Sequence, residues 1–336
     1  MALFLTALMT VGWGSQPVEA SGSSGKGEVA PVKVLSYRPA DVMAPLLARF
    51  TKETGIPTEL DVRRGEGVVE YFQKAAEGPR PDVIVVVDAQ RLAAVAETGA
   101  LRPLPPRALD RIPEAWRDSS GMWAGLSWRV RAVLQPSDGP YVGYQELLGK
   151  LSEGKRVCVR EGDHVYNRGL TAWLRQREGD EFARAWLETV HGKREPISGG
   201  DRDQIRAMAQ GLCDYAVVNH YYFARMVAEE EDAALRDRLA SLRFGPAPGH
   251  GSHPLHANVS GIALTREAGN PHGAEQLAMW LMSPENQAAY AKAVWEFPAA
   301  WPNGGAVLAE AMQPFAHLRA SAPFPAELAR DRSSAR

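Results

Sequence analysis

The stretch PDVIVVVDA, residues 81–89, places five β-branched residues in a row between two aspartates. Such a run is typical of a strand that is buried on both faces, as in a parallel sheet covered by helices. Around it, strands are expected at 32–37 and 56–62, and helices at 41–55, 67–78 and 90–100. This alternating order predicts an α/β fold with a parallel sheet.

A second α/β series follows a proline-rich connector at 102–113 and an apolar stretch at 121–135. Its strands are expected at 156–161 and 213–219, and its helices at 143–151, 169–192, 201–212 and beyond Tyr222. A late strand at 258–265 and a helix at 272–294 are expected to rejoin the first series. The chain would then form two α/β units and cross between two lobes twice.

The N-terminus differs in character from the rest of the chain. Residues 1–20 begin with an apolar run and end at the small-residue site Val18-Glu19-Ala20, which predicts a secretory signal and a mature start near Ser21. The alternative is a short buried helix. No later apolar run reaches the roughly 20 residues of a membrane span. The net charge of -2 argues against a nucleic-acid partner. We therefore expect a periplasmic or secreted monomer.

Cys158 and Cys213 are the two cysteines of the chain, and both lie in strand-like runs. In an oxidising compartment, cysteines on neighbouring strands favour a disulfide. Two separate buried thiols are the alternative, and the sequence leaves both open.

Candidate site residues follow the strands, because ligands of open α/β sheets bind outside the carboxyl ends of the strands. These residues are Tyr37 and Arg38, then His164, Tyr166 and Asn167, then Asn219, His220, Tyr221 and Tyr222, with Arg129 and Arg131 from the 121–135 stretch. One tyrosine at such an edge is usually a residue whose ring packs against the protein and whose hydroxyl faces solvent. Four tyrosines at the same edge indicate a binding site.

Phenols and arginines together favour a particular kind of ligand. A phenol has an ordinary pKa of about 10, so it ionises at neutral pH only beside a strong positive charge. A hard, highly charged cation such as Fe(III) supplies that charge, whereas softer metals select thiolate or imidazole. Three phenolates balance Fe(III), and arginines can hold an additional anion bidentately.

Several motifs carry a resemblance to a known family. They are SYRPADVMAPLLARFTKETGI, PDVIVVVDAQRL, IPEAWRDSSGMWAGLSWRVRA, VCVREGDHVYN, SGGDRDQIRAMAQGLCDYAVVNHYYFARM and NVSGIALT. Over residues 31–330 the chain resembles the periplasmic ferric-ion-binding proteins of bacterial ABC importers. The resemblance implies a two-lobed, class II binding-protein fold with a cleft and a two-strand hinge. It also implies Fe(III) capture in the cleft and delivery to an ABC permease at the inner membrane.

The resemblance also implies boundaries and residue roles. After the signal peptide at 1–20, an N-terminal lobe would comprise 21–127 and 258–336, and a C-terminal lobe 128–257. Tyr166, Tyr221 and Tyr222 match the iron-coordinating tyrosines, and Tyr37 is a further candidate ligand at the cleft edge. Arg38 and Arg129 match positions that hold a synergistic anion, typically carbonate. His220 and Phe223 receive no ligand role.

The sequence departs from the family pattern at two motifs. Pro39 stands where the family often has glutamine after SYR, so a side-chain donor and a backbone N–H are lost near the anion. The family motif EYPV is here EFPA, residues 296–299. Both departures leave the three tyrosines untouched.

Two other functions remain as alternatives. His250, His253 and His256 lie in a Gly/Pro-rich stretch and could bind Zn(II) in a periplasmic enzyme. Arg38, Arg129 and Arg131 could instead hold a phosphonate or an organic acid. The chain lacks G-x-S-x-G, P-loop and H-E-x-x-H motifs, so we do not expect an enzyme. Asp201 and Asp203 in SGGDRDQ are expected to favour a helix start.

Overall fold

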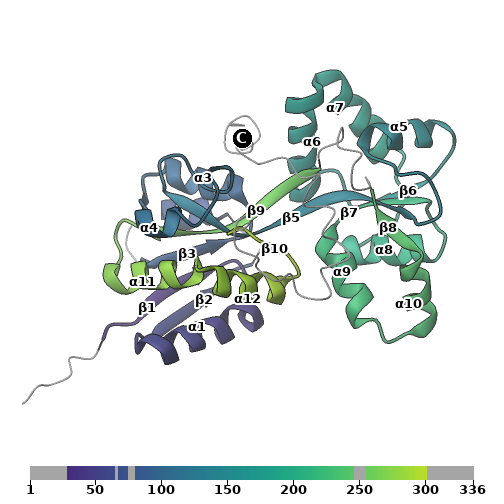
Figure 1. Cartoon of the computed structure of the whole chain (residues 1–336). Helices are drawn as coiled ribbons and strands as arrows, with labels where there is room; N and C mark the ends of the chain where they lie inside the picture. Colours follow the sequence, from purple (N-terminus) through teal and green to yellow (C-terminus); the bar gives the residue numbers. More distant parts are fainter. Residues whose placement is uncertain (1–28, 65–66, 75–79, 246–254, 301–336) are drawn as a thin grey trace, which may run out of the picture.

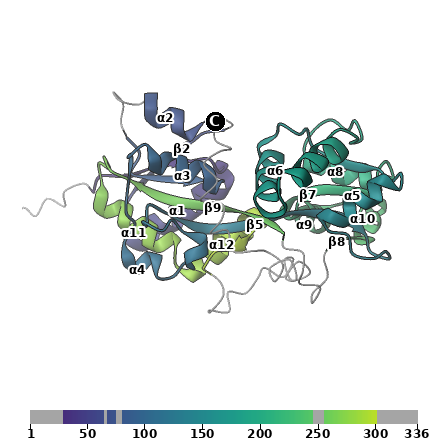
Figure 2. The same cartoon turned by 90° about the horizontal axis from the view of Figure 1, so that it is seen from above.

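Two long strands join two lobes in the computed structural model, which describes residues 29–64, 67–74, 80–245 and 255–300. Figures 1 and 2 show β5 (Trp123–Pro136) and β9 (His256–Thr265) running from one lobe into the other. They pair antiparallel, with a register shift between Gly125 and Ser127. The predicted two-lobed α/β fold is confirmed. The predicted signal peptide lies outside the described residues.

The N-terminal lobe contains the first series of elements and the last. Its strands are β1 (Val32–Ser36), β2 (Thr58–Val62), β3 (Val83–Val86), β4 (Leu101–Arg102) and β10 (Phe297–Pro298). Its helices are α1 (Ala40–Thr54), α2 (Val68–Lys74), α3 (Ala89–Glu97), α4 (Pro106–Leu109), a 3-10 turn (Glu114–Trp116), α11 (Pro271–Leu281) and α12 (Pro284–Val294). β2, β1 and β3 pair in parallel, as the alternating pattern predicts, and β9 joins β3 antiparallel.

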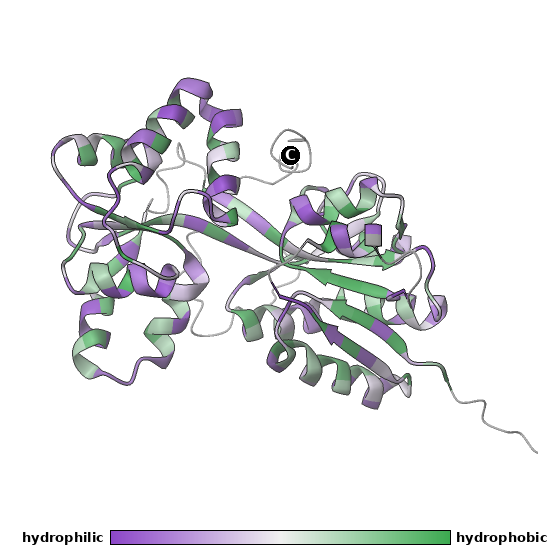
Figure 3. Ribbon diagram, turned by 180° about the vertical axis from the view of Figure 1, so that it is seen from behind, coloured by the Kyte–Doolittle hydropathy of each residue, from purple (hydrophilic) through white to green (hydrophobic). Residues whose placement is uncertain are grey.

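Burial explains why these residues form this lobe. All four residues of β3 are buried, which confirms the strand predicted to be covered on both faces. α1 buries Met43, Leu46, Leu47 and Phe50 on one side and ends at Gly55, whose positive φ of 76° suits glycine. The strands of this lobe are predominantly hydrophobic in Figure 3, whereas its helices alternate in character as half-buried helices do.

The C-terminal lobe contains the second series. Its strands are β6 (Val157–Val159), β7 (Tyr215–Asn219) and β8 (Leu242–Phe244). Its helices are α5 (Tyr144–Ser152), α6 (Val165–Glu178), α7 (Asp180–Trp186), a π-helical turn (Leu187–His191), α8 (Asp201–Ala209), α9 (His220–Glu229) and α10 (Ala233–Ala240). β6 pairs parallel with β7, and β7 pairs antiparallel with β5. The sheet therefore runs β2-β1-β3-β9-β5-β7-β6 through both lobes.

Two helices predicted as continuous are broken. The helix expected at 169–192 is divided at Gly179, whose φ of 94° is incompatible with a continuing helix. The helix expected at 272–294 is divided at Ser283, which caps the new helix and precedes Pro284. In both cases the apolar period continues across the break, so periodicity alone could not show it.

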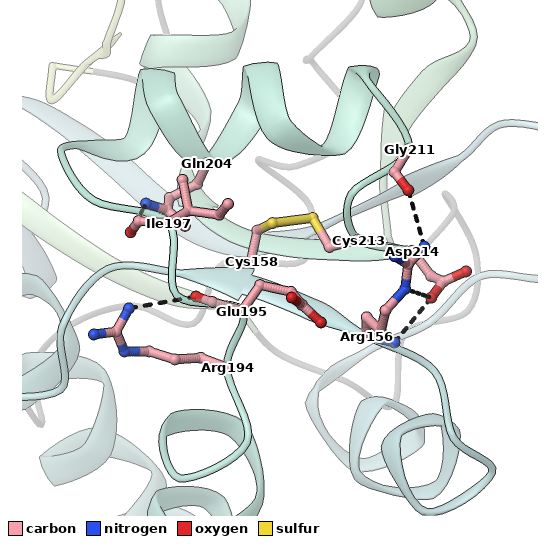
Figure 4. The surroundings of a disulfide bond; sticks show 9 residues. All are labelled: Arg156, Cys158, Arg194, Glu195, Ile197, Gln204, Gly211, Cys213 and Asp214. Atoms are coloured by element: carbon pink, nitrogen blue, oxygen red, sulfur yellow. Dashed lines mark hydrogen bonds and ion pairs between the residues drawn. A yellow bond between two sulfur atoms is a disulfide. The ribbon is translucent and has the colours of Figure 1, made fainter.

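Cys158 and Cys213 form a disulfide with their Cα atoms 5.8 Å apart, as Figure 4 shows. It links β6 to the segment that enters β7, so it fastens the pair of strands together. The bridge closes a loop of 55 residues, which in the chain-entropy account stabilises the fold by about 4 kcal/mol.

The boundaries predicted between 127 and 128 and between 257 and 258 fall within β5 and β9, the two shared strands. The exact partition of the lobes stays a prediction. No helix in the described part of the chain is long and apolar enough to span a bilayer.

Candidate metal centre in the cleft

A cleft of about 400 Å³ is lined by residues from both lobes. Its walls carry four tyrosines and four arginines: Tyr37, Tyr166, Tyr221, Tyr222, Arg38, Arg129, Arg202 and Arg225. All four tyrosines named from the sequence therefore lie at one cavity. Arg38 and Arg129 also line it, as the sequence predicts for an anion site.

Tyr166 is placed by the start of α6. The helix begins at Val165, and the Nδ1 atom of His164 accepts a hydrogen bond from the backbone N–H of Tyr166 at 3.2 Å. His164 thus acts as the N-cap, which satisfies one of the free N–H groups of the first turn. Burial and the charge of Arg160 lower the pKa of His164 to about 4, which keeps the ring neutral and able to accept.

Tyr221 and Tyr222 occupy the first turn of α9, directly after β7 ends at Asn219. Their ring centroids lie 4.2 Å apart, and the hydroxyl of Tyr221 lies 3.2 Å from that of Tyr166. Tyr166 and Tyr221 each hold the second position of a helix that follows one of two paired strands. The positive ends of both helix dipoles therefore face the phenols, which favours negative charge there.

His220 turns away from this cleft. Its Nδ1 atom accepts a hydrogen bond from the backbone N–H of Val130, and its ring stacks on Phe297 at 4.7 Å. The side chain is fully buried, and burial lowers its pKa to about 4. Phe223 is likewise a core residue. That neither residue is a ligand stays a prediction.

The surroundings of Tyr37, Tyr221 and Tyr222 favour the neutral form of these phenols. Burial, followed by the neighbouring phenols of Tyr166 and Tyr222, raises the pKa of Tyr221 well above its ordinary value. Burial and Tyr166 raise the pKa of Tyr222 to about 12. Burial also raises the pKa of Tyr37, although Arg91 and Arg63 oppose the shift. Only a strong local positive charge can therefore ionise Tyr221 and Tyr222 at neutral pH.

A buried carboxylate pairs with one of the predicted anion-binding arginines and acts electrostatically on the other. Glu296 accepts from Arg38 Nη2 at 2.6 Å and from the hydroxyl of Ser127 at 2.5 Å, and is fully buried. Ser260 in turn accepts from Arg38 and Arg129 at 2.5 and 3.2 Å. Burial would raise the pKa of Glu296, but Arg38 and Arg129 outweigh it and lower the pKa. The carboxylate thus already supplies one negative charge to these arginines.

This fold and cleft agree with comparisons to known proteins. Residues 36–288 match the family model described as "Bacterial extracellular solute-binding protein". The chain belongs to this family. It is a family of binding proteins rather than of enzymes.

Named relatives of this solute-binding protein are iron proteins. Iron uptake protein A1 of Synechocystis is 30% identical over 88% of this chain and 86% of the relative. The Trichodesmium protein (IdiA, FutA) solved with iron and citrate ligands is 26% identical, with a TM-score of 0.73 over 90% of this chain and 96% of that one. The open form of ferric iron-binding protein A from Mannheimia haemolytica is 28% identical, with a TM-score of 0.70 over 88% and 90%. The resemblance stated from the sequence is confirmed.

Arg131 does not belong to the cleft wall of this solute-binding protein. The sequence placed it with Arg38 and Arg129, but its side chain is 1% exposed and pairs with Asp201 at 3.0 Å. Alternation along β5 does not separate Arg129 from Arg131, since both point to one face. They differ because β5 passes from the cleft at Arg129 into the core of the C-terminal lobe at Arg131.

Three cleft residues were missed by the sequence reasoning. Arg225 lies three residues after Tyr222, one helical turn away, and that spacing was a usable signal. Arg202 lies within the SGGDRDQ motif, which was interpreted only as a helix start. Glu296 stands in the EFPA motif, and its pairing with Arg38 spans 258 positions, so no local pattern could reveal it.

One of the three histidines of the alternative zinc site, His256, lies in a strand and not in the expected loop. His256 is the first residue of β9, 3% exposed, with its ring 5.9 Å from that of Trp173. It was expected in the loop beside His250 and His253, which lie outside the described residues. Across the described ranges, no group of three or more His, Cys, Asp and Glu side chains could hold a metal ion.

Replacing Glu296 by glutamine is expected to lower the free energy of unfolding by about 3–5 kcal/mol, because Arg38 loses its paired carboxylate and the buried Arg129 loses a nearby negative charge. Urea unfolding at neutral pH measures this. Glu275→Gln is the control, since the Arg102–Glu275 pair is 21% and 43% exposed and should cost about 1 kcal/mol or less.

The same contribution should depend on pH in the unaltered protein. The pKa of Glu296 is lower in the folded state than its ordinary value of about 4.5. Its stabilisation is therefore present above pH 4.5 and lost as the pH falls through the folded pKa. Equal acid sensitivity of the protein and its Glu296→Gln variant would contradict this assignment.

Proposed function

We propose that this protein captures Fe(III) in the cleft through the phenolates of Tyr166, Tyr221 and Tyr222. The observation that carries the proposal is their convergence, with the hydroxyls of Tyr166 and Tyr221 3.2 Å apart and the rings of Tyr221 and Tyr222 4.2 Å apart. Neighbouring phenols oppose each other's ionisation, and the raised pKa values of Tyr221 and Tyr222 lie far from neutral pH. Proton transfer at neutral pH therefore does not explain the cluster. A trivalent hard cation converts that repulsion into attraction and balances three phenolates.

The known relatives support iron as the cargo. Their names describe iron uptake and ferric iron binding, and one was solved with iron and citrate. On this basis the protein acts in the periplasm after export through the signal at 1–20. It delivers iron as a monomer to an ABC permease at the inner membrane, as solute-binding proteins of this kind do.

Lobe closure would complete the site. Tyr166, Tyr221 and Tyr222 all belong to the lobe predicted at 128–257, so iron binds there first. The opposite wall, in the lobe predicted at 21–127 and 258–336, carries Tyr37 and Arg38. A hinge at β5 and β9 would bring Arg38 toward the ion, together with Tyr37 as a further candidate ligand.

The anion is the second component of the proposed site. Arg38 and Arg129 remain the proposed binding residues for a synergistic anion such as carbonate, since both line the cleft. Glu296 already neutralises part of their charge, so an incoming anion competes with a built-in carboxylate. Pro39 is the N-cap residue of α1. It offers the anion no backbone donor, because proline has no N–H.

The alternative of a phosphonate or organic acid held by three arginines is weakened. Arg131 is buried and neutralised by Asp201, so of the three arginines named for this alternative only Arg38 and Arg129 line the cleft, where Glu296 already supplies a negative charge.

Tyr221→Phe should abolish most of the iron affinity, because it removes one phenolate from the centre of the cluster. The loss should exceed the roughly 100-fold that removal of an outer-shell partner causes. Competition with a chelator measures affinity, and the visible phenolate-to-iron charge-transfer band reports the coordination directly. The control is Tyr215→Phe, at the other end of β7 and half-buried.

A colourless unaltered protein after loading with ferric citrate would refute the iron proposal. So would an undiminished band in the Tyr221→Phe variant. A weaker band in the Tyr215→Phe control would show that the effect is not specific to the cleft.

Iron binding should release at least two protons per ion near neutral pH. The raised pKa values of Tyr221 and Tyr222 keep both phenols protonated before binding, and coordination requires their loss. Affinity therefore falls as the pH falls, since protons compete with iron. Titration in weakly buffered solution, corrected for hydrolysis of the iron donor, counts the protons. Release of fewer than two would contradict coordination by both phenols.

Glu296→Gln should strengthen the dependence of iron binding on added bicarbonate, because it leaves Arg38 and Arg129 without their built-in counter-charge. Iron titrations of both proteins, with and without bicarbonate in degassed buffer, test this. An identical bicarbonate response in the two proteins would show that the anion does not use these arginines.

A further inference from the structure

A buried ion pair connects the two chain segments that carry the phenols. Asp201, the first residue of α8, is fully buried, and its Oδ2 atom accepts from the backbone N–H of Asn219 at 2.8 Å. The same oxygen accepts from Arg131 Nη1 at 3.0 Å. Asn219 is the last residue of β7, two positions before Tyr221. Asp201 therefore fixes the junction from which Tyr221 and Tyr222 project.

Arg131 extends this connection to the second junction. Its Nε atom donates to the Oδ1 atom of Asn167 at 3.0 Å. The amide nitrogen of Asn167 donates in turn to the backbone oxygens of Arg160 and Glu161, both at 2.8 Å. Arg160 and Glu161 form the turn between β6 and α6, and Asn167 adjoins Tyr166. One guanidinium therefore links the starts of α6 and α9.

Charge adds to this geometry at Tyr166. The guanidinium carbons of Arg131 and Arg160 lie 5.9 and 5.4 Å from the centre of its ring. Two guanidinium groups near an aromatic ring attract its negative face. They would also stabilise the negative charge of the Tyr166 phenolate when a metal is bound. Asp201 opposes excess positive charge, since it faces Arg131 and has Arg160 at 3.8 Å.

A structural role alone does not account for the placement of this pair. An apolar substitute of similar volume would serve a core at least as well as a buried ion pair. The pair instead has directional bonds to both strand–helix junctions. These bonds lie behind the hydroxyl contact of Tyr166 and Tyr221, which joins the same two helices.

We infer that Asp201 is a positioning residue of the iron site, which acts through Arg131 and Asn167 to hold the three phenols at the spacing of one ion. The inference rests on the proposed function. It assigns to the SGGDRDQ motif a role beyond starting a helix. Positioning groups behind metal ligands typically contribute 10- to 100-fold in metal affinity.

Asp201→Ala should therefore lower Fe(III) affinity by about 10- to 100-fold and shift or weaken the charge-transfer band per bound ion. Asp201→Asn keeps an oxygen that can accept from Asn219 and Arg131, so it should restore most of the band. Chelator competition gives the affinity, and visible spectra of the loaded proteins give the band. Circular dichroism and thermal unfolding establish that each variant is folded.

Asp82 provides a matched control in the N-terminal lobe. It is 1% exposed and accepts from the backbone N–H groups of Lys33 and Asn270 at 2.7 and 2.9 Å, away from the cleft. Asp82→Ala should cost stability in the same way while leaving the band and the affinity unchanged. If Asp201→Ala does not fold, Asn167→Ala cuts the same connection at α6 and should shift the band.

Equal affinity and an unshifted band in the folded Asp201→Ala protein, or in Asn167→Ala, would overturn the inference. An equal loss in Asp82→Ala would do the same, because the effect would then follow stability alone. Absence of the band from the unaltered protein refutes iron binding itself. A normal band in the unaltered protein and in the Asp201 variants refutes only the positioning role.

Discussion

The sharing of β5 and β9 between the lobes is the constraint on which the rest of the structure depends. Both strands continue through one sheet and are almost wholly buried, and Arg129 of β5 lines the cleft. Ser127 and Ser260 pair across the two strands at this point and bond to Glu296, which also holds Arg38. Arg38 on the cleft wall is therefore hydrogen-bonded, through Ser260 and Glu296, to the two strands that join the lobes.

Much of the fold and the phenol cluster could be predicted from the sequence, for reasons that are local. A run such as Val83–Val86 signals a doubly covered strand by itself, and tyrosines that follow strands must meet at one sheet edge. Where helices break was not predictable from periodicity, since Gly179 and Ser283 interrupt patterns that continue beyond them. The ion-pair partners of Arg38 and Arg131 could not be predicted from the sequence either. Arg38 meets Glu296 across 258 positions and Arg131 meets Asp201 across 70, and only the folded chain brings them together.

The two arginines of β5 show how position along one strand decides a role. Arg129 and Arg131 have the same residue type and the same face, and the sequence treated them alike. Arg129 lies where β5 crosses between lobes, so it lines the cleft and donates to Ser260 and the backbone oxygen of Val87. Arg131 lies two residues further, opposite Asn219, where the lobe closes over it and Asp201 neutralises it. Two positions along one strand therefore distinguish an arginine that lines the cleft from an arginine that is paired inside the core.

The charge balance of the cleft suits a site that must both hold an ion and release it. Tyr221 and Tyr222 are half-buried neutral phenols before binding, so the cleft does not then carry uncompensated anions at these positions. In the proposed site, three phenolates on Fe(III) would again be neutral overall, so the loaded site would carry little net buried charge. Protons and iron would then compete for the same phenol oxygens. Positive groups around the proposed site, the helix starts and Arg129 among them, favour the phenolate form.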